Sequence, residues 1–191
     1  RIAFMLLHRI YHEKYQSLYG NGFSENSNIE NEKGLYLGCK LLPFKRITIS
    51  AYTDLYRFPW AKYRIDRSSW GKDFLVHLHH NTSNHINMQL RYKMKIKSEE
   101  EESKQTLRYQ IKGEWNKISL QTQLEGNQDN KEKIRSFGWI VAQDLELKEL
   151  LKRLNINIRY AYFKTDKYNN RLYLYEKDVT SSFSMPLHYG E

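Results

Sequence analysis

A strict alternation of apolar and polar residues is the clearest pattern in the chain. A helix would mix the two classes on every face, whereas a period of two separates them completely. Such a segment predicts a β-strand of about eleven residues, a length that matches a tilted membrane-spanning strand. In the best example, residues 86–96, the two classes are Ile86, Met88, Leu90, Tyr92, Met94 and Ile96 against Asn87, Gln89, Arg91, Lys93 and Lys95.

Weaker versions of this alternation recur along the whole chain and predict an all-β fold. One segment competes with that interpretation, because residues 145–154 contain good helix formers throughout. We interpret it as the ends of two strands around a tight connection, with a helical turn as the alternative. Further strands are expected at residues 2–11, 34–42, 47–52, 73–79, 107–115, 118–125, 137–145, 156–162, 171–176 and 180–188.

The connections between these strands alternate between short and long. Outer-membrane barrels have this asymmetry, with short periplasmic turns and longer extracellular loops. The pattern therefore predicts an antiparallel up-and-down β-barrel of the outer-membrane type, here a partial barrel of roughly 10–11 strands in a single domain, residues 1–191. The chain starts without a methionine or signal peptide, and we expect both ends to be truncated. The short connections are 43–45, 81–84 and 116–117, and the long ones are 12–33, 55–70, 97–105, 126–136 and 164–170.

Composition narrows the class of protein further. The mean hydropathy is -0.79, and no apolar run approaches the roughly 20 residues that a membrane-spanning helix needs. An aromatic content of 14% argues against a disordered chain. The formal charge of +9 favours an anionic cargo if the cations face a lumen. The residues expected to face lipid are Ile86, Met88, Leu90, Tyr92, Leu107, Tyr109, Ile156 and Ile158, and those expected to face the lumen are Arg91, Lys93, Arg108, Lys112 and Arg159.

Two segments, 54–66 and 163–176, mix aromatic residues, cations and carboxylates. These side chains suit stacking and salt-bridged recognition. They could line a binding site or fold inward as a plug, or they could be loops pinned by local ion pairs and aromatic packing. The candidate recognition residues in loops or lumen are Asp54, Arg57, Trp60, Arg64, Asp66, Asp166, Tyr168, Arg171 and Glu176.

The sequence contains no motif for catalysis or for a cofactor. There is no glycine-rich phosphate loop, no nucleophile elbow and no pair of cysteines, since Cys39 stands alone. His77 and His79 would share a strand face, but no cysteine or carboxylate at zinc-ligand spacing completes a set. We therefore expect no enzyme, no cofactor and no metal site.

Four short motifs carry a family resemblance: residues 31–38 (NEKGLYLG), 51–54 with 58–60 (AYTD and FPW), 168–176 (YNNRLYLYE) and 183–186 (FSMP). They resemble the C-terminal barrel region of the helix-hairpin-helix-containing outer-membrane proteins of Bacteroidota. The resemblance implies a location in a bacterial outer membrane. It also implies a link to DNA binding or uptake, for which that family is named because of its helix-hairpin-helix repeats. This chain contains no such repeat, so no residue receives a DNA-binding role.

Two functions remain open on the sequence. The first is part of an outer-membrane barrel that serves as pore, transporter or surface receptor, with the lipid bilayer as partner and an anionic cargo or DNA as ligand. The second is a soluble basic β-protein that binds nucleic acid or polysaccharide through segment 54–66. The first predicts fractionation with the outer membrane, whereas the second predicts solubility without detergent and salt-dependent binding to a polyanion.

Overall fold

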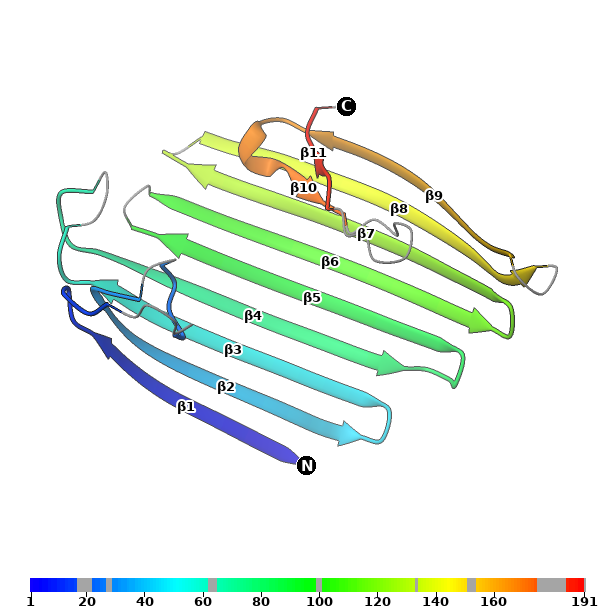
Figure 1. Cartoon of the computed structure of the whole chain (residues 1–191), viewed down its shortest axis with the longest axis horizontal. Coiled ribbons are helices and arrows are strands. Elements are labelled where there is room, and N and C mark those ends of the chain that lie inside the picture. The colour runs from blue at the N-terminus through cyan, green and yellow to red at the C-terminus, as the bar shows by residue number, and fades with distance from the viewer. Residues whose placement is uncertain are drawn as a thin grey trace.

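The computed structural model describes residues 1–16, 22–26, 29–61, 65–98, 101–132, 134–150, 154–174 and 185–190. In this part of the chain, nine long strands form one antiparallel sheet whose strand order equals the sequence order (Figure 1). Each strand is therefore a hairpin partner of the strand before it. The strands are β1 (Ile2–Tyr11), β2 (Glu32–Phe44), β3 (Ile47–Phe58), β4 (Ser69–Asn81), β5 (Ile86–Lys97), β6 (Glu102–Trp115), β7 (Ile118–Lys131), β8 (Ile134–Leu150) and β9 (Leu154–Thr165).

The sheet is open within the described residues. β1 and β9 stand at opposite ends of the strand order, and each pairs with a single neighbour. The predicted all-β, antiparallel up-and-down architecture is thus confirmed, and an open sheet of this topology is consistent with a partial barrel. No helix among the described residues is long and apolar enough to cross a membrane.

Three short elements follow the sheet and lie against one of its faces. The 3-10 turn η1 (Tyr168–Asn170) contacts β7 and β8, and β10 (Leu172–Tyr173) also contacts β8. β10 pairs antiparallel with β11 (Leu187–His188) in a separate two-stranded sheet, drawn in front of β7–β9 in Figure 1. The predicted strands at 171–176 and 180–188 therefore add no strand to the large sheet, and residues 175–184 of those predictions lie outside the described part.

The strand pairing separates the side chains into two classes. In every adjacent pair, residues that face one another across the ladder share a face, so one register fixes the faces of all nine strands. Leu90, for example, lies opposite Leu78 on one side and Tyr109 on the other. The two faces are called the apolar face, which carries Leu90, and the polar face, which carries Arg91. The lipid-facing and lumen-facing sets expected from the sequence fall on the apolar and polar faces respectively.

Two of the long connections predicted from the sequence are largely strand. β7 runs to Lys131 and β8 begins at Ile134, so most of 126–136 belongs to the sheet. β6 begins at Glu102, which likewise shortens 97–105. Polar residues fill both faces there, so the alternation that identifies a strand is lost although the backbone ladder continues.

The connections between strands lie at two opposite ends of the sheet. The two longest, residues 12–31 and 59–68, join strands at the same end as the β5–β6 and β7–β8 connections. We call this the loop end and the opposite one the turn end.

The competing helix at 145–154 is not formed in the described residues. β8 continues to Leu150 and β9 starts at Leu154, with a register irregularity between Leu147 and Leu150. The interpretation as two strand ends around a tight connection is therefore confirmed for residues 145–150 and 154. Pairing with β7 and β9 on both sides outweighs the local helix propensity, which is a weak preference.

Candidate functional site

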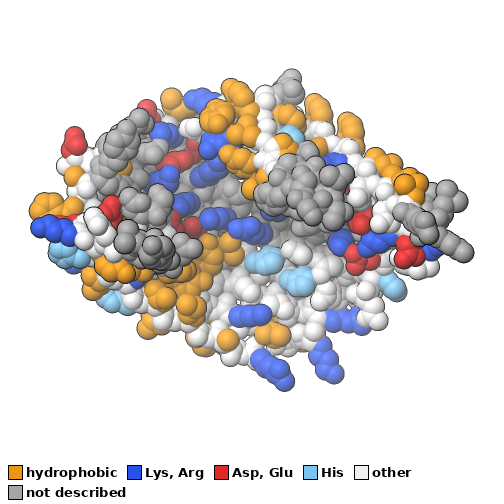
Figure 2. All heavy atoms as spheres, in the orientation of Figure 1, with side chains coloured by type: hydrophobic (Ala, Val, Ile, Leu, Met, Phe, Trp, Pro, Cys, Tyr) orange, Lys and Arg blue, Asp and Glu red, His pale blue; other side chains and the backbone are white. Residues whose placement is uncertain are grey.

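The polar face carries bands of opposite charge that run along the strands. The first acidic band consists of Asp54 on β3 and Asp73 on β4, which lie directly opposite one another. On the other side, Glu125 and Asp129 of β7 and Asp144 of β8 form a second acidic band. Between the two lies a basic band, which Figure 2 shows as Lys and Arg side chains gathered across the middle of this face. Its members are Arg91, Lys93, Lys95 and Lys97 on β5 and Lys104, Arg108 and Lys112 on β6.

Ion pairs link the basic band to both acidic bands. Lys93 Nζ lies 3.0 Å from Asp73 Oδ2, and Arg108 Nε lies 2.7 Å from Glu125 Oε2. These cations are partly exposed and their carboxylates are largely buried. Each of these largely buried carboxylates therefore has a partly exposed cation as its ion-pair partner.

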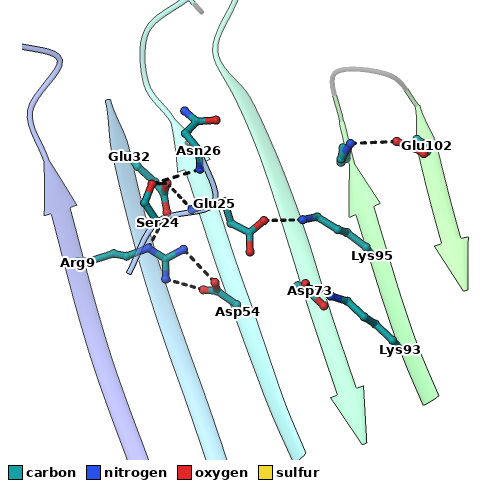
Figure 3. A network of polar contacts seen from close by, with 11 residues as sticks. Arg9, Ser24, Glu25, Asn26, Glu32, Asp54, Asp73, Lys93, Lys95 and Glu102 are labelled. Carbon is teal, nitrogen blue, oxygen red and sulfur yellow. Dashed lines mark hydrogen bonds and ion pairs between the residues drawn. The ribbon is translucent and has the colours of Figure 1, made fainter. Parts of the chain in front are cut away.

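A buried cluster around Arg9 occupies the loop end of β1–β3 (Figure 3). The Arg9 guanidinium donates to Glu32 Oε1 at 2.6 Å and to both oxygens of Asp54 at 2.8 and 2.9 Å. All three side chains are buried. The contact with Asp54 is bidentate, the strongest common geometry for such a pair. Gly34 lies opposite Arg9 on β2, and a Cβ there would collide with the guanidinium.

The same cluster holds residues 22–26 over the polar face; we call these residues the N-terminal cover. Glu32 Oε2 accepts hydrogen bonds from Ser24 Oγ at 2.6 Å and from the Glu25 backbone N–H at 3.0 Å. Glu25 then reaches across the sheet to Lys95 on β5, with 2.5 Å between Oε2 and Nζ, as Figure 3 shows. Phe23 packs edge-on against Tyr36 and under the Arg9 guanidinium. The N-terminal cover and the sheet border an open pocket of about 410 Å³, which is also lined by Asp54, Asp73, Lys93 and Lys95.

A second segment, residues 166–174 with 185–190, covers β7–β9; we call it the C-terminal cover. Its contact with the sheet is an amide network and a small apolar cluster. Asn170 is fully buried, and its side chain donates to Asn127 Oδ1 at 2.8 Å while its carbonyl accepts from Asn127 Nδ2 at 3.0 Å. Gly138 permits this approach, since a Cβ there would lie 2.7 Å from the Asn170 carbonyl oxygen. The apolar cluster consists of Ile140, Ala142, Leu172 and Leu174, flanked by Ala161 and Phe163.

The candidate recognition residues of segment 54–66 do not form one site. Asp54 points into the Arg9 cluster. Arg57 lies on the apolar face near the loop end, with Ser68 Oγ 3.5 Å from its guanidinium. Trp60 is exposed, and its backbone exchanges hydrogen bonds of 2.9 Å with the Asn31 side chain. Asp66 is exposed, and Arg64 lies outside the described residues.

The candidates of segment 163–176 belong to the C-terminal cover. Asp166 accepts the Phe137 backbone N–H at 2.8 Å. The Arg171 guanidinium lies 4.6 Å from the centre of the Tyr168 ring. Its Nε donates to the Tyr173 hydroxyl at 2.6 Å, and this hydrogen bond is the main cause that raises the pKa of Arg171. Glu176 lies outside the described residues.

Sequence analysis missed the residues on which the covers depend: Arg9, Glu32, Asn127 and Asn170. The partners of Arg9 are 23 and 45 residues away in sequence, so no local spacing connects them. A charged residue in the otherwise apolar strand 2–11 was an available signal. Asn127 lies in a segment interpreted as a polar loop. Asn170 lies in segment 163–176, for which a plug, a binding site and a locally pinned loop were all left open.

The histidine pair is placed as expected, on one face of one strand. His77 and His79 lie on the polar face with their rings parallel and 6.5 Å apart. His77 Nε2 is 3.3 Å from Gln89 Oε1. Among the described residues, no three His, Cys, Asp or Glu side chains gather closely enough to hold a metal ion.

Comparison of the chain with models of protein families, with curated proteins and with solved structures found no match.

Proposed function

We propose that this chain is a section of a bacterial outer-membrane β-barrel whose polar face lines a lumen for anionic cargo. The observation that carries the proposal is the apolar face. It exposes large side chains along strand after strand, including Phe4 (80% exposed), Leu107 (51%), Ile158 (54%) and Tyr160 (70%). Soluble monomers rarely expose a continuous apolar surface of this kind, whereas lipid requires one.

The distribution of charge on the apolar face supports the same proposal. Its lysines and arginines on the nine strands lie close to the loop end, where a barrel strand leaves the hydrocarbon layer. Tryptophan and tyrosine side chains such as Trp70, Trp139 and Tyr162 lie near the same end, and Trp115 lies at the turn end. Aromatic girdles at both interfaces are typical of membrane barrels. The cations concerned are Lys33, Arg57, Lys72, Arg135 and Lys164.

The cargo follows from the basic band. Its cations project from the polar face of adjacent strands and give this stripe a positive potential between two acidic bands. The covers lie over the same face, so cargo would meet them. On the family resemblance alone, DNA is one such anionic cargo.

The test places the same charge on each face at neighbouring positions. Leu90→Arg puts a cation in the middle of the apolar face, which at a bilayer midplane costs about 2–4 kcal/mol and should block assembly in the outer membrane. Gln89→Arg puts it on the polar face and should assemble normally. Assembly is measured by outer-membrane fractionation and by the heat-modifiable migration typical of folded barrels.

Three outcomes contradict the proposal. Equal assembly of both variants would remove the lipid role of the apolar face, and a defect only in Gln89→Arg would reverse the two faces. Recovery of the wild-type protein in the soluble fraction, with salt-dependent binding to nucleic acid or polysaccharide, would favour the soluble alternative.

A further inference from the structure

A pocket of about 360 Å³ lies on the polar face over β5 and β6. It is separate from the one under the N-terminal cover, although Lys93 and Lys95 border both. The C-terminal cover supplies one wall, so the pocket is bounded by both sheet and cover. The lining residues are Lys93, Lys95, Lys97, Glu102, Lys104, Thr106, Asn169 and Arg171.

The lysines of β5 are already partly neutralised. Lys93, Lys95 and Lys97 occupy successive positions on the polar face, and each reaches a carboxylate on a different segment. The distances from Nζ to the carboxylate oxygen are 3.0 Å to Asp73, 2.5 Å to Glu25 and 3.3 Å to Glu102. These pairs fix the three ammonium groups along the pocket wall.

Lys104 and Arg171 form no ion pair with a carboxylate in the described part of the chain. Lys104 Nζ donates to the Asn169 carbonyl at 2.6 Å, and the Arg171 guanidinium bonds to Tyr173 and the Tyr168 carbonyl. Asp129 lies opposite Lys104 on β7 and acts on it electrostatically, as Glu102 does. Two cations are thus held by neutral groups at the border of one pocket.

The register adds repulsion at the same place. Lys104 lies directly opposite Lys95, and like charges opposite one another destabilise a sheet. In the Asp54–Asp73 pair, two strands back along the chain, Arg9 and Lys93 offset the repulsion through ion pairs. At Lys95 and Lys104, the ion pair in the described residues is that of Lys95 with Glu25, and Asp129 and Glu102 act on Lys104 without forming an ion pair. An anion bound between these cations would further offset their mutual repulsion.

We propose that this pocket binds a phosphate or sulfate group of the anionic cargo. Lys104 and Arg171 supply the free charge, the β5 lysines the surrounding field, and the Thr106 hydroxyl a neutral donor. Oxyanions of this class are recognised by converging Lys and Arg donors. The volume is near the lower limit of ligand pockets, roughly 300 Å³, so it fits one such group with a small attached moiety.

This inference rests on the proposed function in that it names the chemical class of the cargo. The test is calorimetric titration of the detergent-folded full chain with inorganic phosphate, with sulfate and with chloride. Wild-type protein should bind phosphate or sulfate more tightly than chloride, with an affinity that falls as the salt concentration rises. The double variant, which carries Lys104→Gln and Arg171→Gln together, loses two charge-assisted contacts. It should therefore bind phosphate or sulfate about tenfold more weakly, or weaker still.

Lys40→Gln is the matched control, since it removes one cation from the same face near the turn end of β2. It should change affinity less than about twofold, as expected for a charge more than a Debye length away. Circular dichroism and heat-modifiable migration show that each variant retains the barrel fold.

The inference is overturned if wild-type protein shows no preference for phosphate or sulfate over chloride, or if Lys40→Gln weakens binding as much as the double variant. Its failure is distinguishable from failure of the proposed function. If the chain assembles in the outer membrane but does not bind phosphate, only the proposed site is refuted. If the chain is soluble and binds phosphate, the proposed membrane function is refuted and the proposed site stands.

Discussion

The N-terminal and C-terminal covers lie on the same polar face but are held by different forces. Charged groups hold the first: Arg9, Glu32 and Asp54 are buried together, and Glu25 reaches Lys95. The second is held mainly by the Asn170 amide network and an apolar cluster around Leu172. Its charged contacts, Asp166 with Phe137 and Lys104 with Asn169, are single hydrogen bonds to the backbone. A buried ion-pair cluster beside the Phe23–Tyr36 contact anchors the first cover, whereas the second packs on the apolar side chains of Ile140 and Ala142.

The difference predicts how each cover fails. Removing one member of a buried ion-pair cluster leaves uncompensated charge, whereas truncating an apolar side chain leaves a cavity. The first effect should respond to salt and the second should not, except where ions alter the hydrophobic effect at high concentration.

Arg9→Ala should have the largest effect. It leaves Glu32 and Asp54 buried without their cation and should destabilise the N-terminal cover and the adjoining strands by about 3–5 kcal/mol. Hydrogen exchange of the Glu25 backbone amide, which donates to Glu32, reports on the cover directly. Arg46→Ala, at the turn end, is the control. Unchanged protection of the Glu25 amide in Arg9→Ala would show that the cluster does not hold this cover.

Leu172→Ala should come second. Leu172 is 1% exposed, and loss of a buried leucine costs about 2–4 kcal/mol, depending on how far the site collapses. Urea unfolding and exchange of the C-terminal cover measure it. Leu187→Ala, which is partly exposed, should cost much less. Release of the N-terminal cover by Leu172→Ala would contradict the independence of the two covers.

Glu25→Gln should have the smallest effect. The Lys95–Glu25 pair is partly exposed, and such pairs contribute about 0.2–1 kcal/mol. Raising the salt concentration should loosen the wild-type N-terminal cover slightly and the Glu25→Gln cover less, as followed by limited proteolysis. The comparison fails if salt loosens the C-terminal cover to the same extent.

The sequence predicted the two-faced strands well, because a buried or lipid-facing surface imposes a period of two that each strand repeats locally. It failed where that constraint is absent. Residues 126–131 are polar on both faces, so nothing in their pattern distinguished a strand from a loop, and the ladder with β6 and β8 decided. Leu172 and Leu187 follow extended patterns too, but no local signal told whether they join the large sheet or fold onto its face.

The candidate site was predictable only in its chemistry. The excess of cations follows from the composition, and the placement of Arg91, Lys93 and Arg108 on one face follows from the alternation. The opposition of Lys95 and Lys104 follows from the register of the β5–β6 hairpin. The approach of Arg171 to that pair depends on the C-terminal cover, and hence on the packing of Leu172 and Asn170 against β7 and β8.

By itself, then, the order of residues determined which side chains share a face, since neighbours along a strand point in opposite directions whatever the partner strand. Tertiary structure alone decided which charges meet. Arg9 and Asp54, or Lys104 and Arg171, are separated by long stretches of chain, and only the register of several hairpins and the folding of the covers onto the sheet bring them together.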